Sequence, residues 1–157
     1  MVIHLQYIVC GRSAKKAIED ARERIAKVLN ADPNEIFFTG SGSESDNMAI
    51  RGIAYANKNK GTHIITSKIE HPAVLETCKA LEKEGFKVSY IGVDEKGIVD
   101  LEELKEAVTD ETILITIMYA NNEIGTVQPI KNISNIAKSN NILFHTDAVQ
   151  AVRKHKY

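Results

Sequence analysis

Apolar residues along this chain recur with two different spacings, which alternate in blocks from Ser13 onward. From Ser13 to Leu29 they recur every three or four positions, which is the spacing of one face of a helix. A turn follows at Asp32–Asn34, because proline fixes the backbone and aspartate favours turn geometry. The apolar triplet Ile36–Phe38 then predicts a short buried strand.

The same alternation continues toward the C-terminal residues. Further helices are expected at Glu44–Asn57, Pro72–Glu84, Leu101–Val108 and Ile133–Ser139. Further strands are expected at His63–Thr66, Lys87–Ile91, Thr112–Tyr119 and Ile142–Thr146. Strands separated by helices pair in parallel, with helices on both faces of the sheet. The pattern therefore predicts an α/β fold with a mostly parallel sheet and flanking helices, in one domain over residues 1–157.

Composition and charge narrow the classes of function. The 157 residues are 43% apolar and 26% charged, as in a soluble globular protein. The net charge is −1, without a basic block, so no nucleic-acid partner is expected. No apolar run approaches the ~20 residues that span a bilayer, and Met1–Cys10 does not resemble a signal peptide. Cys10 and Cys78 form no CxxC pair, which favours reduced thiols and a cytoplasmic location.

The segment Gly40–Asp46 is the first candidate site. It lies between an expected strand and a helix, and amides at a helix N-terminus bind anions, most often phosphate. The alternative is structural, because Ser43 and Asp46 have the spacing of a helix capping box. A P-loop is excluded, since no Gly-Lys-Ser/Thr follows. A dinucleotide-binding loop fits poorly, because Ser45 stands where a third glycine belongs and Thr66–Lys68 offers no acid for a ribose.

A second candidate site comprises polar residues that follow two other strands. Ile69–Pro72 follows the strand at His63–Thr66, and Asn121–Glu123 follows the strand at Thr112–Tyr119. The carboxyl ends of parallel strands meet at one edge, where open α/β sheets bind ligands. Alternatively, His71 is a surface residue and the two asparagines form a turn.

The third candidate site is His145–Gln150, after the last expected strand. His145 and Asp147 share a strand face because side chains alternate along a strand. An aspartate at this edge suits a cationic ring nitrogen or a metal, but no further cluster of metal ligands is evident. A serine hydrolase is disfavoured because no Gly-x-Ser-x-Gly occurs. Together the three segments place a phosphate site, a histidine, an asparagine, an aspartate and a glutamine at one sheet edge.

Four motifs carry a resemblance to a known family: Phe38–Asn47, Ile69–Cys78, Asn121–Gln128 and His145–Val152. They resemble cysteine desulfurases of the NifS/IscS type, within the class-V aminotransferases, and the similarity runs from about Gly11 to Val152. The resemblance implies a fold-type I transferase that uses pyridoxal 5'-phosphate. Residues 1–157 would form part of its large domain, without the small domain.

The resemblance implies six cofactor-binding residues, which are Gly42, Ser43, His71, Asn122, Asp147 and Gln150. Gly42 and Ser43 match the pair that binds the cofactor phosphate. His71 matches the imidazole that stacks on the pyridine ring. Asp147 matches the carboxylate that pairs with the ring nitrogen and so keeps the ring electron-withdrawing.

The two remaining positions match amides. Asn122 matches the amide near the ring oxygen, and Gln150 matches the amide that binds the phenolic oxygen. Met1–Cys10 does not match the family's N-terminal strand. The Ser-x-His-Lys segment with the lysine that binds the cofactor covalently is absent at its usual place, as is the nucleophilic cysteine. His155–Tyr157 echoes that segment faintly through Lys156, and no catalytic residue is assigned.

The resemblance implies an activity and partners. Family members remove sulfur from L-cysteine, giving alanine and an enzyme persulfide for iron–sulfur cluster assembly. They resemble one another in forming homodimers, and pass the sulfur to a scaffold or another acceptor. The alternatives are a different class-V activity, such as selenocysteine lyase or an aminotransferase, and a truncated, non-catalytic domain that binds phosphate or pyridoxal phosphate. The sequence as given leads us to expect an incomplete site.

Overall fold

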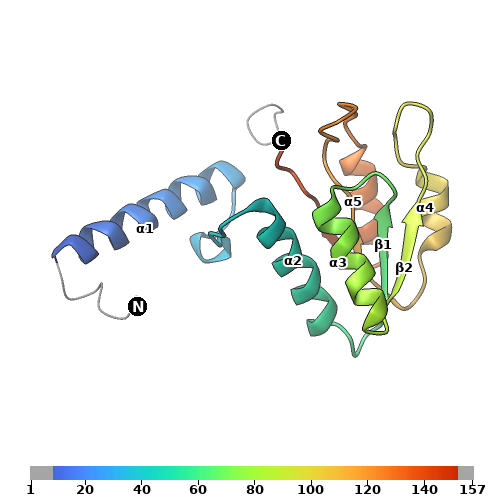
Figure 1. Cartoon of the computed structure of the whole chain (residues 1–157), viewed down its shortest axis with the longest axis horizontal. Helices are drawn as coiled ribbons and strands as arrows, with labels where there is room; N and C mark the ends of the chain where they lie inside the picture. The colour runs from blue at the N-terminus through green and yellow to red at the C-terminus, as the bar shows by residue number, and fades with distance from the viewer. Residues whose placement is uncertain (1–8, 152–157) are drawn as a thin grey trace. The chain divides into compact units, whose positions relative to one another are not determined.

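A computed structural model of the chain describes residues 9–151, with side chains from Gly11 onward, and separates the chain into two compact units (Figure 1). The units are Met1–Gly40 and Ser41–Tyr157. The expectations for Cys10, His155 and Lys156 fall on side chains outside this description. All three candidate sites lie in the second unit, apart from the loop residue Gly40.

The first unit contains one long helix and a short 3-10 turn. Helix α1 spans Val9–Leu29, and η1 spans Pro33–Glu35 after a capping box at Asp32. The expected helix and turn are therefore confirmed. The strand expected at Ile36–Phe38 is wrong, because the segment is not in a strand and Phe37 and Phe38 are 70% and 49% exposed. The prediction took the apolar character of these residues as a sign of burial, and the two phenylalanines are not buried.

The second unit is an α/β sheet with helices on both faces (Figure 1). Its helices are α2 (Gly42–Ala56), α3 (Pro72–Lys83), α4 (Leu101–Ala107) and α5 (Ile130–Ser139). Its strands are β1 (His63–Ser67), β2 (Lys87–Ile91), β3 (Thr112–Thr116) and β4 (Leu143–His145). The strand order is β2-β1-β3-β4, and all three pairings are parallel. The predicted fold class is confirmed.

Two apolar clusters hold the helices against the sheet. The cluster beneath α2 and α3 includes Ile64 of β1 and Leu114 of β3. The cluster beneath α4 and α5 includes their chain neighbours, Ile65 and Ile115. Consecutive residues of a strand face opposite sides of the sheet, and burying each such side chain contributes roughly 1.5–3 kcal/mol. The central strands are therefore fixed from both faces, which makes their carboxyl ends a rigid base for a site.

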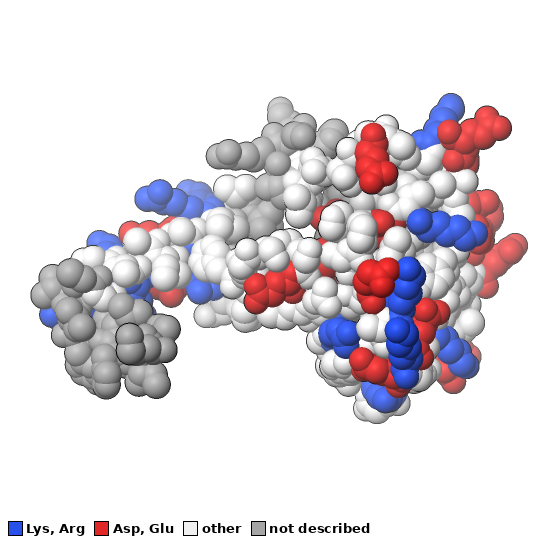
Figure 2. Space-filling model, viewed as in Figure 1, with Lys and Arg blue, Asp and Glu red and all other residues white. Residues whose placement is uncertain are grey.

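The surface and the helices add two general observations. Acidic and basic side chains are intermixed over the face that carries α3 (Figure 2). Within residues 9–151, no helix is both long enough and apolar enough to cross a membrane.

Candidate functional site

A cavity of about 270 Å³ lies at the carboxyl edge of the sheet, where the segments after β1, β3 and β4 converge. It is lined by Gly42, Ser43, Asp46, His71, Met118, Ala120, Asn122, Asp147, Val149 and Gln150. The lining includes every residue that the resemblance assigned to the cofactor. The structure thus brings together four segments that are up to about a hundred positions apart in the sequence.

Helix α2 begins at the cavity and gives it an anion-binding end. Ser41 is the N-cap: its hydroxyl accepts a hydrogen bond from the Glu44 amide at 3.2 Å, and its carbonyl accepts one from the Ser45 amide at 3.1 Å. The amides of Gly42 and Ser43, in the first turn, have no acceptor within the helix. Together with the positive end of the helix dipole they favour an anion.

The alternative of a capping box at Ser43 and Asp46 is wrong, because the cap is Ser41 and Asp46 lies in the second turn of α2. Asp46 is only 6% exposed and lines the cavity. Its Oδ1 lies 3.7 Å from Nε2 of His145. Burial first, and Asp147 second, raise the pKa of Asp46 to about 6, while His71 acts in the opposite direction.

The position of Asp147 follows from pairing that continues beyond the named strands. Just after β3 ends, the Ile117 amide donates to the carbonyl of His145, the last residue of β4, at 3.2 Å, and the Tyr119 amide donates to the Asp147 carbonyl at 2.8 Å. The Asp147 carboxylate then accepts a hydrogen bond from the Val149 amide at 3.0 Å. The Asp147 backbone is therefore held by the Tyr119 amide, and the Asp147 side chain is held by the Val149 amide. Together these two hydrogen bonds fix the carboxylate at the cavity.

His71 is the N-cap of α3, and its Nδ1 accepts a hydrogen bond from the Ala73 amide at 3.1 Å. A backbone amide can only donate, so Nδ1 carries no proton in this cap and the neutral ring holds its proton on Nε2. The cap sets both the orientation and the tautomer of the ring. His145, by contrast, does not line the cavity: its Nδ1 lies 2.8 Å from the Thr116 hydroxyl, and burial lowers its pKa.

The two adjacent asparagines have different surroundings. Asn121 is 8% exposed, and its Oδ1 accepts hydrogen bonds from the Glu123 and Ile124 amides at 2.8 and 3.0 Å. Asn122 is exposed and lines the cavity. The turn-forming alternative therefore holds for Asn121, and the cavity position for Asn122.

Sequence reasoning assigned no cofactor-binding role to the buried acids Asp46 and Glu70. Glu70 is 5% exposed, and burial raises its pKa to about 7, while hydrogen bonds from Ser67 and Met118 act in the opposite direction. One signal was available for Asp46, since it follows Gly42 by four positions and residues so spaced share a helix face. For Glu70 the only signal was its place immediately before His71.

The cavity wall offers several polar groups but, among the described residues, neither a lysine nor a cysteine. Cys78 is fully buried in the core, and its pKa is raised to about 12 by burial and, to a lesser degree, by Glu70 and Glu82. That thiol is a packing group, as its helix position indicated. Within residues 9–151 no group of three or more His, Cys, Asp or Glu side chains is arranged to hold a metal.

The donor set suits one kind of ligand better than others. A helix N-terminus binds an anion, while the carboxylates of Asp147 and Asp46 attract a cation at the same cavity. His71, Asn122 and Gln150 add a ring and two amides to the lining. A flat, cationic ring that carries a phosphate meets all of these requirements, and pyridoxal phosphate has this chemistry.

Comparison with known proteins gives concordant results. Residues 3–157 match the family described as Aminotransferase class-V. The chain is 65% identical over 138 residues to the cysteine desulfurase IscS of Clostridium botulinum, covering 88% of this chain and 35% of that relative. It is 61% identical over 142 residues to the cysteine desulfurase IscS of Methanosarcina thermophila, covering 90% and 35%.

Solved structures agree with this. A NifS-like protein superposes with a TM-score of 0.89 at 46% identity, over 93% of this chain and 40% of that one. A structure described as SspA in complex with cysteine superposes with a TM-score of 0.86 at 46% identity, over 92% and 42%. The chain thus spans about 35% of the length of the curated relatives given above.

Proposed function

Because the chain belongs to the class-V aminotransferase family, we propose that residues 1–157 form part of the large, cofactor-binding domain of a cysteine desulfurase. The proposed activity removes sulfur from L-cysteine and leaves alanine. The observation that carries the proposal is the convergence of all six expected cofactor residues on one cavity. The 65% identity to an IscS and the relative solved with cysteine support the choice of reaction and substrate.

Two ends of the cavity would hold two ends of pyridoxal phosphate. The amides of Gly42 and Ser43 would bind its phosphate, because they point from a helix N-terminus without helical acceptors. Asp147 would pair with its ring nitrogen, and a carboxylate beside that nitrogen favours the protonated ring. When bound, the cofactor supplies an electron-withdrawing ring to the substrate amino acid.

Three further side chains would orient the ring. His71 would stack on it, with Nδ1 engaged by the Ala73 amide so that the proton stays on Nε2. Asn122 and Gln150 would donate hydrogen bonds to its oxygens, since amide nitrogens are donors. These roles are binding and orientation, and no catalytic residue is assigned among the residues that line the cavity.

The remaining parts of the reaction would come from elsewhere in a longer protein or an assembly. A covalent lysine and a sulfur-accepting cysteine are needed for turnover, and the described cavity wall contains neither. We infer a homodimer, a cytoplasmic location and an iron–sulfur scaffold or other sulfur acceptor, because the relatives are cysteine desulfurases named IscS.

A hybrid enzyme tests the proposal. The 138-residue segment of this chain that matches the Clostridium botulinum IscS replaces its counterpart in that protein, and alanine and sulfide are measured with L-cysteine, L-selenocysteine and cofactor. We expect L-cysteine turnover in the hybrid, its loss in the hybrid with Asp147→Ala, and its retention with Glu76→Gln on the exposed face of α3. A folded hybrid that binds the cofactor but turns over only L-selenocysteine, or neither substrate, would refute the desulfurase assignment.

A further inference from the structure

We propose that Glu70 and Asn121 are positioning residues that lock two loops together and so fix His71 and Asn122 in the cavity wall. The inference rests on the proposed function, because it concerns the same cavity. Each positioning residue immediately precedes the wall residue that it would fix. Neither lines the cavity itself.

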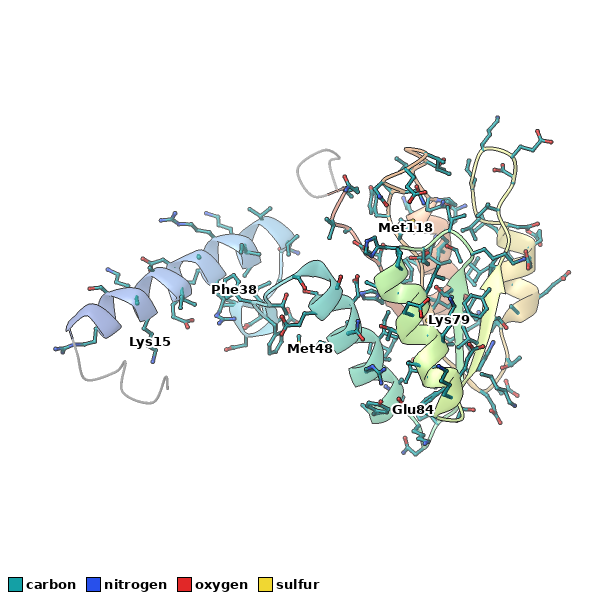
Figure 3. All side chains as sticks on the ribbon, viewed as in Figure 1. Lys15, Phe38, Met48, Lys79, Glu84 and Met118 are labelled. Atoms are coloured by element: carbon teal, nitrogen blue, oxygen red, sulfur yellow. The ribbon has the colours of Figure 1, made fainter. Side chains whose placement is uncertain are left out.

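The Glu70 carboxylate joins the ends of two neighbouring strands. It accepts a hydrogen bond from the Ser67 hydroxyl at 2.6 Å, and both its oxygens lie 3.0 Å from the Met118 amide that donates to them. Ser67 is the last residue of β1, and Met118 lies just after β3. Figure 3 shows Met118 at the end of the sheet opposite Glu84, which is the end that carries the cavity.

The backbone geometry explains why an acceptor is needed at this point. The β1–β3 ladder reaches Thr66 opposite Thr116, after which the chain leaves β1 in a turn at Lys68. The amides of Ile117 and Tyr119 point toward the β4 side, where they find the carbonyls of His145 and Asp147. The Met118 amide points to the other side, because successive amides alternate along a strand. Glu70 supplies the acceptor that the departed strand no longer offers.

Asn121 makes the reciprocal connection from the other loop. Its Nδ2 donates to the Ile69 carbonyl at 2.9 Å, while its Oδ1 closes the turn that presents Asn122. Glu70 therefore connects the loop after β1 to the end of β3, and Asn121 connects the loop after β3 to the loop after β1. Two such ties constrain the relative placement of His71 and Asn122 more than either alone, because they are made by different residues in opposite directions.

Glu70→Ala and Glu70→Gln separate positioning from charge. Glutamine retains an oxygen for the Met118 amide, whereas alanine leaves that buried donor without a partner. We expect Glu70→Ala to weaken pyridoxal phosphate binding about tenfold, measured by absorbance titration of the full chain at a temperature where the variant is folded. Glu70→Gln should restore most of the affinity. Glu76→Gln, an exposed acid on α3, is the matched control and should change nothing.

A readout on the ligand-free chain makes the test independent of the cofactor. The ¹⁵N chemical shifts of the His71 ring report its tautomer, which the Ala73 amide fixes only while the loop is in place. We expect these shifts to move toward an average of both tautomers in Glu70→Ala and to stay unchanged in Glu70→Gln. A lower unfolding midpoint in Glu70→Ala with unchanged His71 shifts and unchanged affinity would overturn the proposal, because it would show a role in stability alone.

Asn121→Ser keeps the test decisive if Glu70→Ala does not fold. Serine retains an oxygen for the turn but is too short to reach the Ile69 carbonyl. We expect weaker binding and shifted His71 signals, and unchanged values of both would overturn the proposal. If the unsubstituted chain itself fails to bind pyridoxal phosphate, the proposed function fails. The His71 shifts of the ligand-free variants still decide whether Glu70 and Asn121 are positioning residues.

Discussion

The two ends of the sheet both bury polar side chains, but they do so in different ways. At the amino end, His63 is 6% exposed, and its Nδ1 and Nε2 each lie 2.8 Å from a hydroxyl, of Thr112 and Ser89 respectively. Hydroxyls donate or accept, so either tautomer of the ring is satisfied. Burial, and then Lys87, lower the pKa of His63 and keep the ring neutral.

At the carboxyl end, acids gather near the candidate cavity. Burial, and to a lesser degree the charges of neighbouring acids that include Asp147, raise the pKa values of Asp46 and Glu70 to about 6 and about 7. Mutual satisfaction of neutral groups is what a structural network requires. Crowding of like charges beside a cavity carries a free-energy cost and is typical of binding sites. The amino end also borders a cavity, lined in part by His63, Lys87 and Ser89. The difference therefore lies in the side chains: neutral groups that satisfy one another at the amino end, and acids that suit a cationic ligand at the carboxyl end.

The largest effect that we expect at the carboxyl end is a pH dependence of the free energy of unfolding that is due to Glu70. Its pKa in the folded chain, about 7, lies above the usual 4.5, so the folded state holds the proton more tightly. The contribution of Glu70 to the free energy of unfolding is fully present below pH 4.5 and is lost as the pH rises through about 7. Glutamine does not titrate. The free energy of unfolding of Glu70→Gln, relative to that of the unsubstituted chain, should therefore rise by up to about 3 kcal/mol between pH 5 and pH 8. Urea unfolding at both pH values measures this, and parallel pH profiles would contradict it.

The next effect concerns the cofactor. Asp147→Asn removes the charge that pairs with the ring nitrogen, and a charge-assisted hydrogen bond is worth roughly 1.5–3 kcal/mol. Affinity for pyridoxal phosphate should therefore fall by about one to two orders of magnitude, as measured by cofactor fluorescence. Glu44→Gln, an exposed acid in the first turn of α2, is the control. Equal losses from both substitutions would show that general electrostatics, rather than the Asp147 contact, governs binding.

The amino end should respond in the opposite manner. His63→Ala removes the partner of two hydroxyls and leaves a void, and should lower the free energy of unfolding by about 2 kcal/mol. Affinity for pyridoxal phosphate, measured well below the unfolding transition, should not change. A loss of affinity would break the distinction between the two ends. Ser89→Ala, which removes one of the two hydroxyls, should show a smaller loss of stability.

The smallest effect is expected at the anion-binding end. A Cβ at Gly42 would lie 3.4 Å from Cγ2 of Val149, an ordinary van der Waals contact. Gly42→Ala should therefore leave the affinity for inorganic phosphate unchanged and stabilise the chain by at most about 0.5 kcal/mol, because alanine favours the helix. Phosphate titration and thermal unfolding measure the two quantities. A tenfold loss of phosphate affinity would show that the ligand requires closer backbone approach than proposed.

The limits of sequence-based prediction follow from particular residues. Both bounds of strand β2 were predicted correctly, because a short apolar run between two helices leaves few other positions for a strand. The strand expected to reach Tyr119 ends at Thr116, because the Met118 amide bonds to the side chain of Glu70 rather than to a strand. Phe37 and Phe38 were assigned to a buried strand because periodicity does not report whether a neighbouring strand exists. The raised pKa values of Asp46 and Glu70 were not predicted, because they depend on burial and on acids distant in the sequence.

The central claim is that the carboxyl end of the sheet binds pyridoxal phosphate and that the amino end does not. Amide chemical shifts of the ¹⁵N-labelled chain, recorded during titration with pyridoxal phosphate, test it most directly. We expect the largest shifts at Gly42 and Ser43, smaller ones at Asn122 and Val149, and none at His63 and Ser89. Titration with inorganic phosphate alone should move Gly42 and Ser43 only. Shifts of equal size at both ends of the sheet, or at neither, would contradict the account.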